Sequence, residues 1–203
     1  CSDSSEPLYK DVSQPVERRI DDLMGRMTLR EKIGQMCQFV GLEHLRMAER
    51  NATPEEIRDG HAQGYYPGYH STDILRMVET GEASSFFHVV TPEEANYLQG
   101  LAQKSRLQIP LLIGIDAIHG NGLYSGATIY PTSIGQAATF DPDLVERLCR
   151  ETALEMRAMG AQWTFNPNVE VARDARWGRC GESFGEDPLL VGRMGAASVR
   201  GYQ

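Results

Sequence analysis

The sequence predicts an α/β protein whose four parallel strands form the first half of a (β/α)8 barrel, preceded by an N-terminal helical leader. Short apolar runs alternate four times with helices that carry capping signals, which is typical of parallel sheets with right-handed crossovers. Polar residues gather after the third and fourth runs, at the strand ends where barrels carry their active sites. A complete barrel takes about 250 residues. Because a leader and an insertion occupy much of the 203 residues, we expect half a barrel.

The N-terminal part predicts a tether followed by helices. Residues 1–12 begin with Cys1 and a polar, acidic run that has nothing to pack, so we expect a flexible tether. A start at cysteine resembles a bacterial lipoprotein after removal of its signal peptide, with Cys1 as the lipid anchor; an arbitrary boundary of the sequence is the alternative. Apolar residues then recur at helical spacing from Ser13 to Met27. Residues 28–31 have the form of a capping box that begins a second helix.

The remaining elements follow from apolar runs and caps. The runs expected to form strands are residues 36–40, 84–90, 109–116 and 162–166. The third is almost continuously apolar, which is typical of a parallel strand covered on both faces. Helices are expected after Thr91, Asp141 and Asp187, because each precedes a proline, which is tolerated at the first helical position.

Residues 41–85 are the least regular stretch, with one short helix expected at residues 53–56. A long insertion is either a lid near a site or surface padding. Tyr65, Tyr66 and Tyr69 cluster in it. We leave open whether these rings stack on a sugar face or pack locally.

Composition excludes several classes of function. The net charge is −8 and the basic residues are scattered, which argues against nucleic acid and anionic membranes as partners. No apolar run approaches the roughly 20 residues of a membrane span. The cysteines form no C-x-x-C pair and the chain has neither a G-x-G-x-x-G after a strand nor a P-loop, so no metal, disulfide framework or nucleotide cofactor is predicted. A neutral or weakly polar small molecule is the expected ligand.

Asp116 is the first candidate site residue. It ends the third apolar run, where a carboxylate must either lose solvent or accept hydrogen bonds from a ligand such as a sugar. Capping of a turn, or pairing with an arginine of the fold, is the alternative. His119 follows closely and is either a ligand contact or a structural donor.

The densest cluster of charge follows the fourth run. Arg173, Arg176 and Arg179 recur every third residue around Trp177, and Glu182 follows. Guanidinium forks match neighbouring hydroxyls or carboxylates. Such a cluster either binds a polar ligand or forms an ion network that holds its own loop, and Trp177 either stacks on a sugar ring or packs beneath the loop.

These residues lie in motifs that resemble a known family. The motifs are residues 27–36, 114–120 (Gly-Ile-Asp-Ala-Ile-His-Gly), 126–131, 166–167, 173–179 (Arg-Asp-Ala-Arg-Trp-Gly-Arg) and 182–188 (Glu-Ser-Phe-Gly-Glu-Asp-Pro). In this order they resemble the N-terminal barrel of family 3 glycoside hydrolases, typified by β-glucosidases. The resemblance runs from about residue 15 to the end. Ala175 stands where the family usually has proline.

The resemblance implies hydrolysis of terminal, non-reducing β-D-glucosyl residues with retention, through an aspartate nucleophile and a separate acid/base. Carried over by position, the resemblance implies that Asp116 and Arg179 bind hydroxyls of the first sugar and that Glu182 orients Arg179. Arg173, His119 and Trp177 are candidates for supporting residues of the same site. The nucleophile and the acid/base are expected beyond Gln203. Residues 13–203 would then be a truncated catalytic domain that is inactive alone.

Three alternatives stay open: a non-catalytic carbohydrate-binding remnant, a β-xylosidase and an N-acetylhexosaminidase. The expected partner is a β-linked oligosaccharide or glucoside, and no cofactor is expected. With Cys1 as a lipid anchor, the expected location is the periplasm or cell surface of a bacterium.

Overall fold

The computed structural model describes residues 6–62 and 64–203. The first five residues of the expected tether, including Cys1, lie outside the described residues. Part of the remaining tether is ordered, because Leu8–Lys10 form a short 3-10 helix, η1. The prediction of a flexible segment is therefore wrong for these residues.

The sheet consists of four parallel strands in chain order: β1 (Gln38–Val40), β2 (Ser85–Phe87), β3 (Leu112–Ile115) and β4 (Trp163–Thr164). In this register Phe39 lies beside Phe86, and Phe86 beside Ile113. The strands are shorter than their apolar runs. Sequential parallel strands with helical connections are the pattern of a (β/α)8 barrel, so the predicted fold class is confirmed.

Helices cover one face of this sheet. α5 (Ser71–Thr80), α6 (Pro92–Ala102) and α8 (Pro142–Met159) bring their apolar sides together with the strands in one main core. The largest fully buried side chains of that core are Ile74, Val78, Phe86, Val89, Leu98, Ile113, Ile115 and Met159. On the other face, Leu112 and Trp163 are 54% and 41% exposed. The expectation that β3 is covered on both faces is therefore wrong in the described chain.

The insertion after β1 is mostly helical. It contains α3 (Leu42–Asn51), α4 (Pro54–Arg58) and α5, so the prediction of a single short helix was wrong. Of these three helices, only α4 carries a Thr-x-x-Glu capping box. α3 has no side-chain cap of its own, and its Leu42 amide instead donates to the Glu94 carboxylate, 52 residues away. Such a long-range cap leaves no local signal in the sequence.

The leader forms α1 (Val16–Arg26) as predicted, and α1 packs with η1. None of its residues is buried, so its apolar stripe, which includes Val16, Ile20 and Met24, faces outward.

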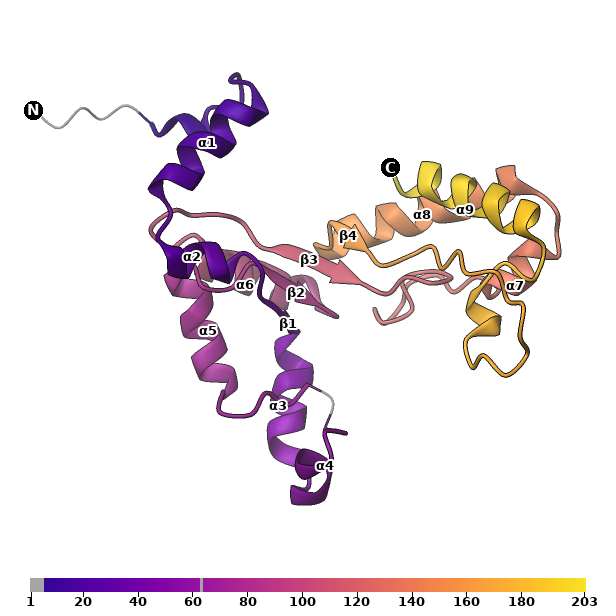
Figure 1. Ribbon diagram of the computed structural model, residues 1–203, viewed down its shortest axis with the longest axis horizontal. Coiled ribbons are helices and arrows are strands. Elements are labelled where there is room, and N and C mark those ends of the chain that lie inside the picture. The colour runs from indigo at the N-terminus through magenta and orange to yellow at the C-terminus, as the bar shows by residue number, and fades with distance from the viewer. Residues whose placement is uncertain (1–5, 63) are drawn as a thin grey trace, which may run out of the picture.

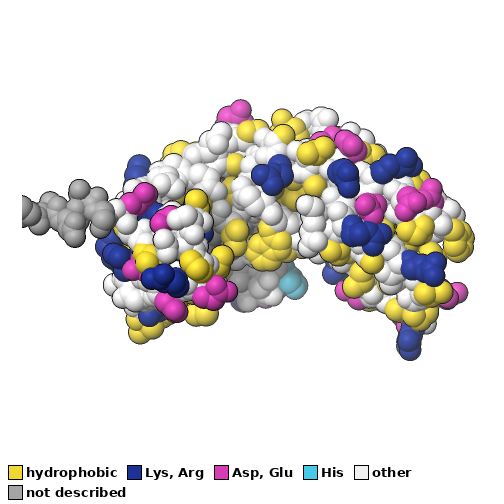
Figure 2. Space-filling view, turned by 90° about the horizontal axis from the view of Figure 1, so that it is seen from above, with side chains coloured by type: hydrophobic (Ala, Val, Ile, Leu, Met, Phe, Trp, Pro, Cys, Tyr) yellow, Lys and Arg dark blue, Asp and Glu magenta, His cyan; other side chains and the backbone are white. Residues whose placement is uncertain are grey.

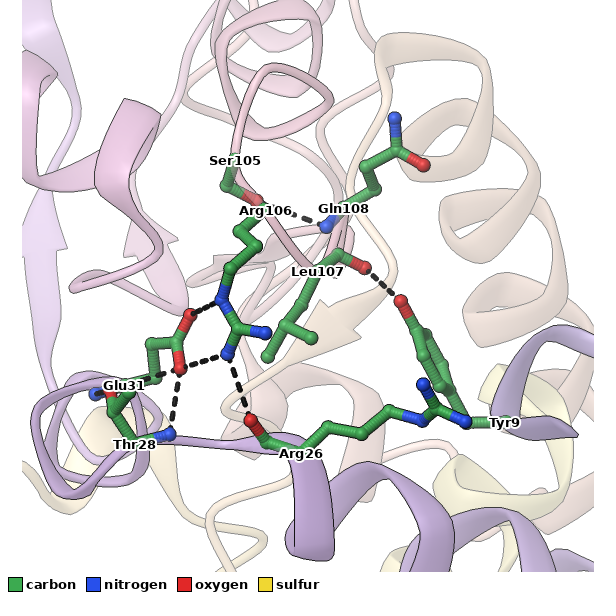
Figure 3. A network of polar contacts seen from close by, with 8 residues as sticks. All are labelled: Tyr9, Arg26, Thr28, Glu31, Ser105, Arg106, Leu107 and Gln108. Carbon is green, nitrogen blue, oxygen red and sulfur yellow. Dashed lines mark hydrogen bonds and ion pairs between the residues drawn. The ribbon is translucent and has the colours of Figure 1, made fainter. Parts of the chain in front are cut away.

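Figure 3 shows how the leader is joined to the loop after α6. The Tyr9 hydroxyl donates to the Leu107 carbonyl at 2.8 Å. The Arg106 guanidinium donates to the Arg26 carbonyl at 2.9 Å and to Glu31 Oε2 at 2.7 Å. Glu31 also closes the predicted capping box at the start of α2 (Leu29–Gly34). One carboxylate thus satisfies both a helix terminus and an arginine from another segment.

A second, smaller core lies at the C-terminal end. It joins α7 (Ser133–Ala137), α8 and α9 (Pro188–Tyr202) and includes Val145, Val191 and Met194. α8 and α9 lie side by side there, apart from α3 and α4 (Figure 1).

The surface mixes charges of both signs. Figure 2 shows Lys and Arg interspersed with Asp and Glu near both ends of one face, and hydrophobic side chains toward its middle. In the part of the chain that the structure describes, no helix is long and apolar enough to cross a bilayer.

Candidate active site

Two polar side chains meet where neighbouring strands end. His88 directly follows β2, and Asp116 directly follows β3. The backbone of His88 is left-handed, with φ of 55°, a conformation that costs a non-glycine residue about 1–2 kcal/mol. The ring Nε2 lies 2.9 Å from Asp116 Oδ2. The strand ends thus place an imidazole against the carboxylate that the sequence selected.

The Asp116 carboxylate is open to solvent. Its side chain is 44% exposed. Among residues 6–62 and 64–203, His88 is its one hydrogen-bond or ion-pair partner. The alternative that Asp116 pairs with an arginine of the fold is therefore not what the structure shows.

Arg179 is held by Glu182, at η2 (Cys180–Glu182). The Nη2 and Nε atoms of Arg179 donate to Glu182 Oε2 at 2.6 and 3.0 Å, and Asn168 Nδ2 donates to the same oxygen at 2.9 Å. The Arg179 hydrogen bond lowers the pKa of Glu182, with Asn168 a smaller cause. Glu182 thus fixes the position of the Arg179 guanidinium, and Asn168 in turn holds Glu182.

The negative charge of Asp116 also acts on Arg179. The hydrogen bond to Glu182 is the largest cause that raises the pKa of Arg179, and the negative charges of Glu170 and Asp116 raise it further. The Arg179 side chain is more than half exposed, and its Nη1 atom makes no hydrogen bond among the described residues. Loops after β3 and β4 therefore bring an open carboxylate and a fixed guanidinium to one edge of the sheet.

The other members of the arginine cluster behave differently. Arg176 pairs with Asp174 at 2.5 Å, and this hydrogen bond lowers the pKa of Asp174. The Arg173 side chain is exposed and makes no ion pair within the described chain. Trp177 is half-buried, and its backbone amide donates to the Asp174 carbonyl at 3.1 Å. The cluster is thus partly an ion network that holds its own loop.

His119 fastens the loop after Asp116. Its Nδ1 donates to the Tyr130 carbonyl at 2.8 Å, and the Tyr130 amide donates back to the His119 carbonyl at 2.8 Å. Gly120 has φ of 109°, and a Cβ there would lie 2.1 Å from the Thr128 carbonyl oxygen. The structure gives His119 the geometry of a structural donor.

Tyr66 packs locally. Its hydroxyl accepts from the Val40 amide at 3.0 Å, and its ring meets Phe39 edge-on at 5.3 Å. Tyr69 is exposed.

Sequence reasoning missed His88 and Asn168. His88 was counted within a strand, although it follows an apolar run as Asp116 does, so the same strand-end rule would have selected it. Asn168 carried no such signal, because its partner Glu182 lies 14 residues away in a loop.

The described residues hold no group of three or more His, Cys, Asp or Glu side chains arranged for a metal ion. The three cysteines that the structure describes are free thiols.

Residues 28–203 match the family described as the Glycosyl hydrolase family 3 N terminal domain. The chain belongs to this family. The predicted resemblance is therefore confirmed, and the parallel sheet with its helices agrees with the TIM-barrel-like α/β fold of the family 3 domain.

Several β-glycosidases are similar to this family 3 chain. A lysosomal β-glucosidase of Dictyostelium discoideum is 32% identical over 188 residues, which cover 91% of this chain and 22% of the relative. A periplasmic β-glucosidase of Salmonella typhimurium is 32% identical over 185 residues, 91% of this chain and 20% of the relative. A β-xylosidase of Formosa agariphila is 41% identical over 114 residues, 54% of this chain and 16% of the relative. The chain thus spans about a fifth of the length of these relatives.

A solved structure supports the same relationship. A mutant β-glucosidase of Listeria innocua in complex with laminaribiose is 30% identical, with a TM-score of 0.70 over 92% of this chain and 24% of that one. These relatives hydrolyse O-glycosyl bonds.

Proposed function

We propose that this chain supplies the sugar-binding half of the barrel in an exo-acting, retaining β-glycosidase that removes terminal β-D-glucosyl residues. The observation that carries the proposal is the open Asp116 carboxylate at the end of β3, close enough to Arg179 for the two charges to interact. Family membership supports it.

The two groups suit a sugar. An ionised carboxylate accepts hydrogen bonds from neighbouring hydroxyls, and a guanidinium donates to them through a fixed fork. Glu182 and Asn168 hold that fork in place, so little side-chain entropy is lost when a sugar binds. Hydroxyl contacts of this kind strengthen in the oxocarbenium-like transition state. Asp116 and Arg179 would therefore lower the barrier as well as bind substrate.

Retention needs two further carboxyl groups about 5 to 5.5 Å apart, one as nucleophile and one as acid/base. In this proposal both lie outside residues 1–203, in the part of the relatives that this chain does not cover. Residues 13–203 then act as part of a catalytic domain and are inactive alone.

The substrate proposal rests on the relatives. Their names include β-glucosidase, and the Listeria structure holds laminaribiose, so a β-linked glucoside is the first candidate. The 41% identity to a β-xylosidase favours a β-xyloside as the second.

The proposed location is the periplasm or the cell surface, because one relative is periplasmic. Lipidation at Cys1 is part of the proposal. Mass spectrometry of the native protein checks it, and an unmodified Cys1 would contradict it.

The test of function uses the protein expressed from the complete open reading frame. It should hydrolyse 4-nitrophenyl β-D-glucoside, and proton NMR should show the β-anomer of glucose first. The purified 203-residue chain should show no turnover, and robust hydrolysis by it would contradict the proposed division of labour. Saturable binding of glucose by an inactive complete protein would instead favour the carbohydrate-binding remnant.

A further inference from the structure

An open cavity of about 630 Å³ lies beside the candidate sugar site. Val40 and Phe87, at the ends of β1 and β2, form one wall, and the α3 residues His44, Met47 and Ala48 form another. His88 lines the cavity and also contacts Asp116 at 2.9 Å. The cavity and the Asp116 carboxylate therefore share one imidazole and lie at the same edge of the sheet.

We propose that this cavity receives the leaving group of the glycoside and that it selects bulky, mostly apolar aglycones. The inference rests on the proposed function. The volume lies in the range of pockets that enclose drug-sized ligands, about 300–1,000 Å³. A methyl or other small leaving group would leave most of it unfilled.

The chemistry of the wall favours an apolar occupant over a second sugar. Aliphatic and aromatic carbon from Val40, Met47, Ala48 and Phe87 faces the space, and burial of such carbon contributes about 25 cal/mol per Å². Asn51, Glu56 and His61 also line the cavity and can meet a few polar groups of the occupant, whereas a second glucose unit presents hydroxyls around its whole rim. An aglycone with a bulky apolar body and a few polar groups suits this mixed lining better.

His44 supplies a second, independent observation. Its Nε2 is buried and has no hydrogen-bond partner within residues 6–62 and 64–203, and its ring lies 6.0 Å from that of His88. A buried polar atom without a partner costs about 1–3 kcal/mol. A hydroxyl or ether oxygen on the aglycone that came within hydrogen-bond distance would satisfy this nitrogen.

The test fills the cavity without touching the sugar contacts. Met47 is 45% exposed on α3 and lines the cavity, so Met47→Trp should occupy part of it. In the complete enzyme, this change should raise KM for 2-naphthyl β-D-glucoside at least about tenfold and leave kcat/KM for methyl β-D-glucoside within twofold. Met36→Trp is the matched control, because Met36 is 80% exposed just before β1 and does not line the cavity. Met36→Trp should leave KM and kcat/KM unchanged for both glucosides.

Two results for Met47→Trp would overturn the inference. One is an equal change in KM for the naphthyl and methyl glucosides, and the other is a rise in KM for cellobiose alone. Ala52→Leu, a smaller filling of the same cavity, replaces Met47→Trp if the larger variant does not fold.

If the wild-type enzyme hydrolyses neither glucoside, the proposed function itself is contradicted. Calorimetric titration with free 2-naphthol then still reports on the cavity. Saturable binding that Met47→Trp removes supports an aglycone site, and no binding overturns it.

Discussion

Asp116 and His88 show how single residues at strand ends make a site. Neighbouring parallel strands end at one edge of the sheet, so the residues that follow β2 and β3 come within hydrogen-bond distance. The left-handed backbone at His88 is unusual for a residue with a side chain. Strain of this kind gathers near functional sites, and here it accompanies an imidazole that faces Asp116.

The first residue-scale prediction concerns Asp116. In the complete enzyme, Asp116→Ala should lower kcat/KM for an aryl β-glucoside on the order of 10²- to 10³-fold, because it removes hydrogen bonds that strengthen in the transition state. Steady-state kinetics measure this loss. Asp21→Ala removes an exposed carboxylate from α1 and should leave kcat/KM unchanged. Unchanged kinetics in Asp116→Ala would exclude this residue from the site.

The second concerns Glu182. Glu182→Gln keeps the shape of the side chain but removes the charge that holds Arg179. We expect a rise in KM of about tenfold, the scale of one lost charge-assisted hydrogen bond. Glu186→Gln, a nearby exposed change, is the control. Equal effects of the two variants would show that Glu182 does not orient Arg179.

At the scale of elements, caps and close contacts set where helices begin and end. α8 ends at Gly160, whose φ is 103° and whose added Cβ would lie 2.8 Å from Ala95 Cβ. Both the backbone and the packing against α6 therefore require glycine. Gly25 differs, because it lies inside α1 with nothing within 4 Å of an added Cβ.

These two glycines make a matched pair. Gly160→Ala should lower the free energy of unfolding by about 1–3 kcal/mol through strain and overlap. Gly25→Ala should raise it by about 0.5–1 kcal/mol, since alanine has the higher helix propensity. Thermal melts of the two variants measure the difference. Equal shifts would contradict the backbone geometry at Gly160.

The contact between α2 and the loop after α6 should stabilise the fold to an extent that depends on pH. The Arg106 hydrogen bonds are the largest cause that lowers the pKa of Glu31, followed by the Thr28 backbone. A carboxylate whose folded pKa is lowered adds stability above its unfolded pKa, about 4.3, and loses it as pH falls through the folded pKa. Arg106→Gln should therefore lower Tm at pH 7 by a few degrees and flatten the fall of Tm between pH 5 and pH 3. A fall as steep as in the wild type would contradict this coupling.

How far the sequence predicts these elements depends on whether their signals are local. The caps at Thr28, Thr91, Asp141 and Asp187 lie beside the helices that they begin, and all four helices were predicted. The cap of α3 comes from Glu94, so α3 was missed. Asp116 was found because it directly follows an apolar run. The pairing of Arg179 with Glu182 was expected only from the family resemblance.

At the scale of the whole molecule, four strands in chain order leave β1 and β4 as the edges of the described sheet. One face is covered by helices, and the other exposes Leu112 and Trp163. Edges and apolar faces of this kind favour association. The purified 203-residue chain should therefore sediment as a species heavier than a monomer, and Leu112→Lys should shift it toward monomer. A monomeric wild-type chain would contradict this expectation.

The most direct test of the central claim measures kcat/KM of the complete enzyme and of Asp116→Ala on aryl β-glucosides that each lack one hydroxyl. If Asp116 binds a hydroxyl of the first sugar, a substrate that lacks this hydroxyl should have a much lower kcat/KM with the wild type. With Asp116→Ala the same substrate should show little further loss of kcat/KM, because the variant has already lost that contact. Equal losses in both enzymes at every hydroxyl would show that Asp116 binds none of them.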